Sequence, residues 1–308
     1  MTRSIGIIVF AAAFAAAAAG QPGPDAWFTP PPEFAKDFGR YRSPLLFDDG
    51  RPVRTAADWQ KRRQEILAFW HRALGPWPAL IAKPAVEYLA SEKRDNFTQH
   101  RVRVEVAPGK RTTDGYLLVP EGKGPFPAVI VVYYEPETPI GKGKSAMRDH
   151  AYQLARRGFV TLSMGTPETS RQYPSAERVE VQPLSMLGYT AANMYHALAN
   201  MKFVDAKRVG ITGHSYGGKW SMFASCLYEK FACAAWSDPG IVFDEARSNV
   251  NYWEPWYIGW QPGEQRPRGT VTVERPRTGP YKQLYEAGRD LHELHALMAP
   301  RPFLVSGG

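Results

Sequence analysis

The sequence predicts an α/β protein whose core is a doubly wound, mostly parallel sheet flanked by helices. Segments typical of strands and helices alternate along most of the chain, which is the order that a parallel sheet with crossover helices requires. Residues 128–134 form a nearly continuous apolar run, as expected for a strand buried on both faces. Another apolar segment, residues 208–212, leads into Gly-x-Ser-x-Gly at 213–217 and then into a helix-forming segment. A chain of 308 residues can bury one large core, so we expect one such domain.

The first predicted element is an amphipathic helix over residues 56–74. Its apolar residues recur at helical spacing, and residues 61–64 (Lys, Arg, Arg, Gln) are expected on the polar face. Gly75, with prolines soon after it, ends the helix. The predicted apolar face consists of Trp59, Ile66, Leu67, Phe69, Trp70 and Leu74.

Strands and helices then follow one another to the end of the chain. Residues 98–106 alternate around Val102, Val104 and Val106, which is typical of a strand with one buried face. We expect strands at residues 86–89, 98–106, 113–119, 128–134, 159–164, 208–212, 232–236 and 302–305. We expect helices at residues 146–157, 184–201, 219–228 and 286–298.

The N-terminus has the pattern of a signal peptide, which we assign to residues 1–20. Arg3 supplies a positive charge, residues 5–19 form an apolar stretch that is short for a membrane span, and small residues precede the cleavage site. An uncleaved membrane anchor is the alternative. We therefore expect export to the periplasm or secretion, with no stable membrane association after cleavage. Residues 21–55 are expected to be irregular because they are rich in proline.

The charge pattern bears on the expected partners, and the two cysteines bear on disulfide bonding. The formal charge is +8, and the basic residues are spread along the sequence. Nucleic-acid binding needs a clustered basic face, so we expect no nucleic-acid partner. Cys226 and Cys233 are expected to be two buried free thiols, although export would permit a disulfide between them.

The stretch from about residue 238 to 282 is rich in aromatic residues and proline, and lies between a predicted strand and the next helix. In a doubly wound sheet this position lies over the carboxyl edge, where ligands bind. We therefore predict a lid or pocket wall. Trp253, Trp256 and Trp260 are candidate platforms for sugar rings, and burial in the core is the alternative for each.

Ser215 is the candidate covalent nucleophile. A strand, a turn with glycine at 213 and 217, and a following helix form the setting of a nucleophile elbow, in which a Cβ at either glycine would clash. The tetrahedral intermediate then needs an oxyanion hole. We assign one donor to the backbone N–H of Tyr216. The second is expected from Tyr134 or Glu135, in the turn after the strand at 128–134, and we assign the backbone N–H of Glu135.

A serine nucleophile needs a base, usually a histidine that a carboxylate orients. Asp238, directly after the strand at 232–236, is either that acid or part of a structural Asp-Pro-Gly turn. His214 is expected to point away from Ser215. His292 and His295 have a spacing that permits metal ligation, but we interpret them as parts of a helix. We expect no metal and no organic cofactor.

Three stretches resemble the α/β-hydrolase superfamily, and within it bacterial carbohydrate esterases of the acetyl xylan esterase and glucuronoyl esterase kind. They are residues 59–66 with 74–78, the elbow, and residues 290–292 with 296–302. Glucuronoyl esterases typically have Gly-Cys-Ser-Arg-x-Gly-Lys at the elbow. Here Gly213, Ser215, Gly218 and Lys219 match, whereas His214 and Tyr216 replace the cysteine and arginine. The resemblance implies that Lys219 contacts the sugar acid.

The resemblance also implies a serine ester hydrolase that acts through an acyl-enzyme on small-molecule or polysaccharide esters. Under this interpretation the domain spans residues 56–308 and is incomplete, because its last strand and helix, the acid and the histidine are expected beyond Gly308. A hydrolase of the prolyl-oligopeptidase or dienelactone-hydrolase type is one alternative. A non-catalytic binding protein with a relic elbow is another.

Overall fold

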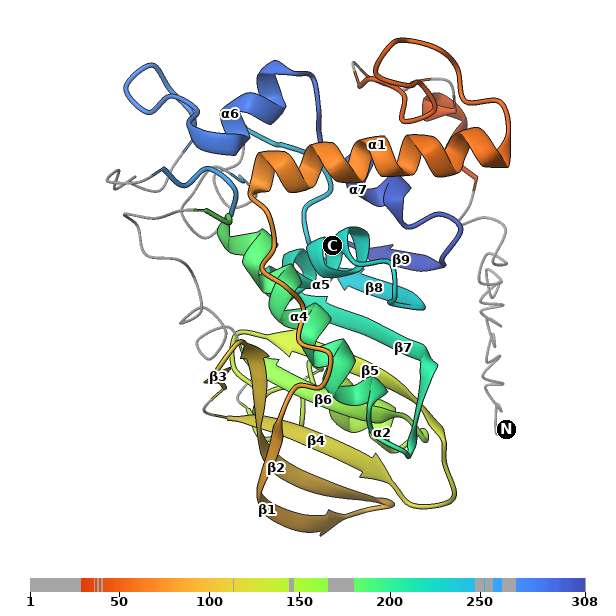
Figure 1. Cartoon of the computed structure of the whole chain (residues 1–308), viewed down its shortest axis with the longest axis vertical. Helices are drawn as coiled ribbons and strands as arrows, with labels where there is room; N and C mark the ends of the chain where they lie inside the picture. The colour runs from red at the N-terminus through yellow and green to blue at the C-terminus, as the bar shows by residue number, and fades with distance from the viewer. Residues whose placement is uncertain are drawn as a thin grey trace, which may run out of the picture. The chain divides into compact units, whose positions relative to one another are not determined.

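The computed structural model describes residues 29–35, 37, 39, 41–112, 114–143, 147–165, 180–246, 252, 257–261 and 270–307. The chain divides into two compact units, residues 1–41 and 42–308. Among its described residues, the first unit has one short 3-10 helix, η2 (Pro32–Phe34). The second unit holds the sheet and the helices that are labelled in Figure 1.

A nine-stranded sheet runs through the second unit in the order β1-β2-β4-β6-β5-β7-β8-β9, with β3 paired to β2. Strands β5 to β9 pair in parallel, whereas β1 to β4 are joined by antiparallel ladders. The prediction of a doubly wound, mostly parallel sheet is therefore confirmed. The strands are β1 (Val86–Arg94), β2 (Phe97–Ala107), β3 (Lys110–Arg111), β4 (Gly115–Pro120), β5 (Phe126–Tyr133), β6 (Val160–Gly165), β7 (Val204–His214), β8 (Cys233–Ser237) and β9 (Phe303–Ser306).

Helices lie on both faces of the sheet (Figure 1). Two long helices, α4 and α5, pack against β5 and β7, while α2 contacts β4, β5 and β6. Helix α1 lies across α7 and α6. The helices are α1 (Ala56–Leu74), α2 (His150–Ala155), α4 (Pro183–Ala199), α5 (Tyr216–Leu227), α6 (Gly279–Glu286) and α7 (His292–Leu297).

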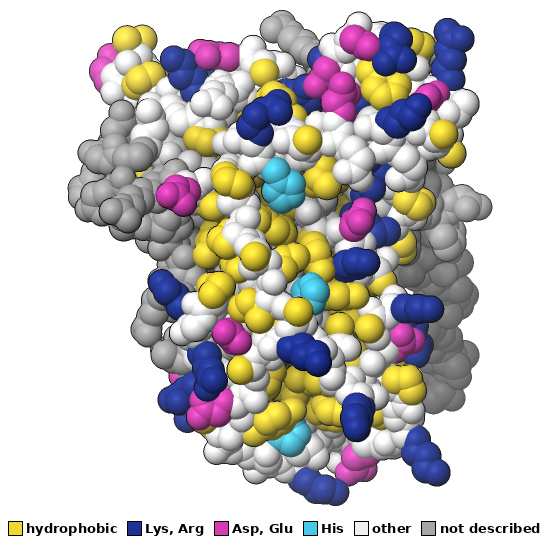
Figure 2. Space-filling model, viewed as in Figure 1, with side chains coloured by type: hydrophobic (Ala, Val, Ile, Leu, Met, Phe, Trp, Pro, Cys, Tyr) yellow, Lys and Arg dark blue, Asp and Glu magenta, His cyan; other side chains and the backbone are white. Residues whose placement is uncertain are grey.

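Helix α1 has the predicted bounds, and Thr55 caps its N-terminus by accepting a hydrogen bond from the Asp58 backbone N–H. The prediction of its polar face was wrong at two positions, because the side chains of Arg62 and Arg63 are buried. Arg62 can be buried because it forms an ion pair with Glu293 of α7, whose carboxylate lies 3.2 Å from the guanidinium. Figure 2 shows the face that carries α1 and α4, where Lys and Arg side chains lie scattered among acidic and uncharged ones.

The predicted helix over residues 286–298 is wrong in its bounds. The chain instead forms two short helices, α6 and α7, separated by a turn. Gly288 adopts a left-handed conformation in this turn, with φ of +65°, which ends α6. The backbone N–H of Arg289 then donates to the carbonyl oxygen of Leu284.

The two cysteines are both free, as predicted, but only one of them is buried. Cys226 lies inside α5, and burial raises the pKa of its thiol. Cys233 is exposed at the start of β8, so its predicted burial is wrong. The reason is that this face of β8 borders a groove.

The chain changes direction in the sheet at β5. From β5 it continues to β6 on one side and later returns to β7 on the other side. The carboxyl ends of these strands point to the same edge, as the arrowheads show (Figure 1). Such a topological switch point is where open α/β sheets bind ligands, so the ends of β5 and β7 mark the place to look for a site.

Candidate active site

Ser215 lies in a strained turn between β7 and α5, with φ of 56° and ψ of −115°. Side-chain-bearing residues rarely adopt a positive φ, and such strain gathers at functional turns. The backbone N–H of Ser215 donates to the carbonyl oxygen of Ser237, at the end of β8, over 2.8 Å. The turn therefore holds the serine between two neighbouring strands, half-exposed at the carboxyl edge of the sheet.

The two glycines of the elbow are required by close backbone approaches. A Cβ added to Gly213 would lie 2.3 Å from the carbonyl oxygen of Gly217. A Cβ added to Gly217 would lie 2.2 Å from the carbonyl oxygen of Val132, in β5. Both distances are far below van der Waals contact, as the sequence pattern predicted. They also place the first turn of α5 directly against the end of β5.

Tyr134 is a site residue that the sequence interpretation missed as a side chain. Its hydroxyl lies 3.0 Å from Oγ of Ser215. Sequence reasoning had considered only the backbone of this turn. Tyr134 directly follows β5, the strand beside β7, so its place at the switch point was the signal that could have identified it.

The two residues predicted to supply oxyanion donors lie in two neighbouring turns, Tyr216 after β7 and Glu135 after β5. Tyr216 is the first residue of α5, and its ring lies 6.1 Å from that of Tyr134. Glu135 follows Tyr134, and its carboxylate accepts a hydrogen bond from the hydroxyl of Thr138. The structure thus brings the turn at residues 134–135 beside the elbow through the hydrogen bond between Tyr134 and Ser215.

Asp238 directly follows β8 and is exposed at the same edge as Ser215. Its φ is +52°, and its backbone N–H donates to the carbonyl oxygen of Ser306, in β9, over 2.6 Å. Among the described residues, no hydrogen bond joins its carboxylate to Ser215 or to a histidine. Burial lowers the pKa of both His214 and Lys219, and the negative charge of the Asp238 carboxylate opposes that shift in each.

The side chain of His214 turns away from Ser215, as predicted. Its Nδ1 lies 2.9 Å from the hydroxyl of Ser237, and its ring stacks on Tyr133 at a centroid distance of 6.4 Å. Burial lowers the pKa of His214, and the charge of Arg148 lowers it further. In the described part of the chain, no histidine side chain makes a hydrogen bond to Oγ of Ser215.

The residues predicted to bind substrate have different surroundings. Lys219 is buried, with 4% of its surface exposed, and its ammonium donates to the carbonyl oxygen of Pro239 over 2.7 Å. Trp260 is half-buried, and its backbone exchanges two hydrogen bonds with the side chain of Gln182, each of 2.9 Å. Trp253 and Trp256 lie outside the described residues.

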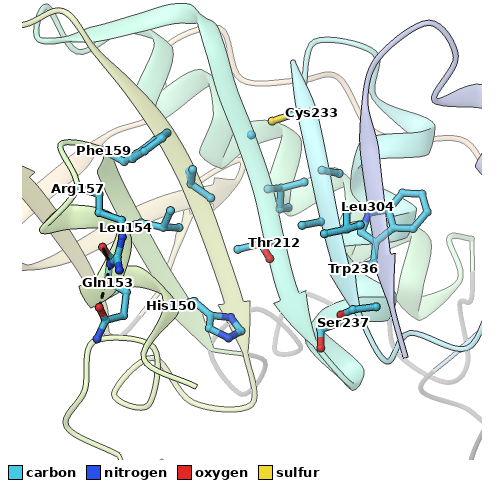
Figure 3. Close-up of a pocket in the computed structure, with 16 residues that line it drawn as sticks. His150, Gln153, Leu154, Arg157, Phe159, Thr212, Cys233, Trp236, Ser237 and Leu304 are labelled. Carbon is cyan, nitrogen blue, oxygen red and sulfur yellow. Dashed lines mark hydrogen bonds between the residues drawn. The ribbon is translucent and has the colours of Figure 1, made fainter. Parts of the chain in front are cut away.

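An open groove of about 590 Å³ lies on the sheet face that borders α2, opposite α5. Figure 3 shows its walls, with His150 and Gln153 on one side and Leu304 on the other. Its floor is formed by β5, β7 and β8, and includes Thr212. The groove reaches Ser237 but is not lined by Ser215, so it is separate from the candidate active site.

His292 and His295, whose spacing would permit metal ligation, contact other groups in the fold. His292 makes a 2.8 Å hydrogen bond to the carbonyl oxygen of Arg42. His295 lies 3.2 Å from the sulfur of Met222, and its ring packs against that of Trp236. Within the described ranges, no group of three or more His, Cys, Asp or Glu side chains could hold a metal ion.

Comparisons with known proteins give one family model and several similar proteins. Residues 148–287, less than half of the chain, match the model of the prolyl oligopeptidase family. A curated relative is a 4-O-methyl-glucuronoyl methylesterase from Schizophyllum commune, 26% identical over 195 residues, which are 61% of this chain and 47% of that protein. Another is the esterase EstD from Thermotoga maritima, 28% identical over 40% of this chain and 28% of its own length.

Among solved structures, a glucuronoyl esterase from Solibacter usitatus is similar, with a TM-score of 0.64 and 20% identity. The match covers 86% of this chain and 78% of that one. The chain thus spans about half the length, or less, of the curated relatives that it matches. At this level of identity the structural likeness shows a common fold.

Proposed function

We propose that this chain, which has the α/β-hydrolase fold, hydrolyses carbohydrate esters through an acyl-enzyme formed on Ser215. The observation that carries the proposal is the strained elbow, with Ser215 at φ of 56° and the hydroxyl of Tyr134 3.0 Å from its Oγ. The substrate class is supported by the relatives, which are a glucuronoyl methylesterase and a glucuronoyl esterase.

In the proposed reaction, Oγ of Ser215 attacks the ester carbonyl carbon and loses its proton to a base. The carbonyl oxygen becomes an oxyanion, which the backbone N–H groups of Tyr216 and Glu135 would stabilise. Collapse breaks the bond to the alcohol, which leaves with the proton. Water then attacks the acyl-enzyme, so that the acid is released and Ser215 is restored.

The hydroxyl of Tyr134 supplies a third donor in this scheme. Glucuronoyl esterases typically have an arginine after the nucleophile, and this chain has Tyr216 instead. A side-chain donor would then be missing, and the Tyr134 hydroxyl is close enough to replace it. It is hydrogen-bonded to Ser215 before substrate arrives and can turn to the oxyanion as Oγ becomes acylated.

The acid and the base are assigned separately. Asp238 is proposed as the acid, since it stands at the same edge and its charge is felt by His214. None of the seven histidines, all of which the structure describes, makes a hydrogen bond to Oγ of Ser215, so no histidine of this sequence is proposed as the base. Serine acyl transfer needs no metal or organic cofactor, so none is proposed.

The aromatic segment from about 238 to 282 is proposed to act as a lid over this edge. Trp260 is a proposed sugar platform there, together with Trp253 and Trp256. The segment remains hydrogen-bonded to the body of the fold through Gln182, which holds both backbone groups of Trp260. A substrate ring would stack on an aromatic face while its hydroxyl groups stay in water.

Export is proposed from the sequence of residues 1–20, which lie outside the described residues. The irregular segment, residues 21–55, would link this signal peptide to the hydrolase domain over residues 56–308. Of the helices that the structure describes, none is long and apolar enough to cross a membrane. No membrane or nucleic-acid partner is proposed for the mature protein.

A peptidase of the prolyl oligopeptidase type is the second candidate, because that family model matches residues 148–287. The matched segment includes the elbow, which esterases of this fold share. A panel of acetyl, glucuronoyl and nitrophenyl esters, with a proline-containing peptide amide as comparison, decides between the two. Hydrolysis of the amide alone would replace the esterase proposal.

A further inference from the structure

Lys219 has an unusual environment for a lysine beside a nucleophile. It lies in the first turn of α5, four residues after Ser215, and is buried. Its ammonium donates to the carbonyl oxygen of Pro239 over 2.7 Å. It also lies over the rings of Tyr252 and Tyr257, at 5.1 and 5.5 Å from their centroids. The charge therefore faces a backbone carbonyl and two aromatic faces.

The carbonyl that Lys219 holds belongs to the turn at residues 238–240, which begins with Asp238. The hydroxyl of Tyr252 reaches two carbonyl oxygens of the same turn, that of Pro239 at 2.7 Å and that of Gly240 at 2.8 Å. Ser237, the residue before the turn, accepts a hydrogen bond from the Ser215 backbone. The turn is thus fixed on one side by Lys219 and Tyr252, and joined on the other to the nucleophile.

Buried charge is tolerated only where other groups compensate for lost hydration. Burial lowers the pKa of Lys219 to about 8, and the carboxylate of Asp238 opposes that shift. The groups that face the ammonium are Asp238, Tyr252 and Tyr257, and burial raises the pKa of Tyr252 well above its usual value. The ammonium of Lys219 therefore already has its interaction partners within the protein.

We propose that Lys219 is a positioning residue that fixes the Asp238–Gly240 turn beside Ser215, and that it does not contact the substrate. The role of this turn in catalysis rests on the proposed function, but the anchoring of the turn does not. A lysine whose ammonium is held by the Pro239 carbonyl cannot also donate to the sugar of a uronate ester, which is uncharged once its carboxyl is esterified. Its loss should therefore affect acetyl esters and uronate esters alike.

Hydrogen exchange tests the anchoring without any need for activity. Lys219→Met removes the charge and keeps most of the side-chain volume. The control is Lys230→Met, because Lys230 is exposed after α5. Since a hydrogen bond from a charged group contributes more than a neutral one, amide exchange in peptides covering residues 238–243 should become about tenfold faster or more in Lys219→Met alone. Unchanged exchange in this variant would overturn the proposal.

The unaltered protein offers a second measurement if Lys219→Met does not fold. Raising the pH through about 8 neutralises the ammonium, according to its pKa. Protection of the same amides, corrected for the intrinsic rise of exchange with pH, should then fall. Tyr252 stays protonated in this range. Constant protection between pH 7 and 9 would contradict anchoring by the charged lysine.

Kinetics separate positioning from substrate contact. In ester-hydrolysis assays, Lys219→Met should lower kcat by a similar factor for acetyl and methyl glucuronoyl esters, with little change in KM. A rise in KM confined to the glucuronoyl ester would show that Lys219 contacts the sugar, and would overturn the proposal. If the unaltered protein hydrolyses neither ester, the proposed function fails while the exchange results still decide the anchoring.

Discussion

The hydroxyl of Tyr134 and Oγ of Ser215 lie 3.0 Å apart, although 81 residues separate them in the sequence. The two residues follow β5 and β7, which are paired in parallel from Phe126 to Val132. The contact therefore results from two neighbouring strands ending at the same edge. Among the described side chains, the phenol of Tyr134 is therefore the one best placed to act on a reaction at Ser215.

Tyr134→Phe should reduce kcat for a nitrophenyl ester by about 10²-fold, the effect of losing one oxyanion donor, with little change in KM. The ring would remain, so its edge contact with Tyr133 at 5.1 Å should persist. Tyr133→Phe is the matched control and should retain nearly full activity. An equal loss in both variants would point to packing of the rings rather than to the Tyr134 hydroxyl.

Ser215→Ala should bring ester hydrolysis to the background rate, because the proposed acyl-enzyme can no longer form. Ser237→Ala is a suitable control, since Ser237 is the adjacent serine at the end of β8. Mass spectrometry after treatment with a phosphonate ester should find one adduct, on Ser215, and none in Ser215→Ala. Undiminished turnover in that variant would exclude Ser215 as the nucleophile.

Glu293→Gln should destabilise the fold by about 3–5 kcal/mol, the usual effect of breaking a buried ion pair. The Glu293 side chain is 1% exposed and accepts hydrogen bonds from Arg62, Arg289 and Trp70. Removing its charge takes away the buried acidic partner of Arg62 and Arg289, which keep only the partly exposed carboxylate of Asp48 and, for Arg62, that of Glu65. Urea unfolding measures the effect.

The control for that experiment is Glu121→Gln, because Glu121 is 53% exposed and lies 3.0 Å from Lys93, whose side chain is 81% exposed. An exposed pair of this kind contributes about 0–1 kcal/mol, so little change is expected. A similarly small effect at Glu293 would mean that the buried network adds little to stability.

His295 should make the protein sensitive to acid. Burial, together with the charge of the nearby His292, lowers the pKa of His295 to about 4, whereas the unfolded chain titrates near 6.5. Between these values the unfolded state binds more protons, so stability falls as pH drops from about 6.5 to 4. The full effect is on the order of 3 kcal/mol.

Thermal or urea unfolding at several pH values tests this dependence. His295→Gln cannot titrate, so its stability should vary less than that of the unaltered protein between pH 6.5 and 4. His150→Gln is a useful comparison, because His150 lines the open groove. Parallel pH profiles for the unaltered protein and His295→Gln would contradict a neutral His295 in the folded state.

The sequence was informative where local pattern and burial coincide. Helix α1 has the predicted bounds, since a capping residue, helical periodicity and a glycine all mark it. The elbow around Ser215 was predictable because Gly213 and Gly217 are required by backbone contacts within a few residues or with the adjacent strand. The order of strands and helices was sufficient for the fold class.

Features that depend on distant residues could not be predicted. Arg62 is on the expected polar stripe of α1, but it is buried because Glu293 lies opposite it in the fold. The hydroxyl of Tyr134 gained its importance from the pairing of β5 with β7, which no local pattern reveals. Lys219 matched a motif residue by position, whereas its contact with Pro239 depends on the turn after β8.

The ion pair between Arg62 and Glu293 joins residues 231 positions apart. On a ribosome that adds about 5–20 residues per second, α1 would wait roughly 10–50 s for its acidic partner. Until then Arg62 lacks its buried acidic partner, although Trp70 of α1 can already pack against Phe223 of α5. Completion of the buried charge network is thus coupled to the emergence of α7, late in synthesis.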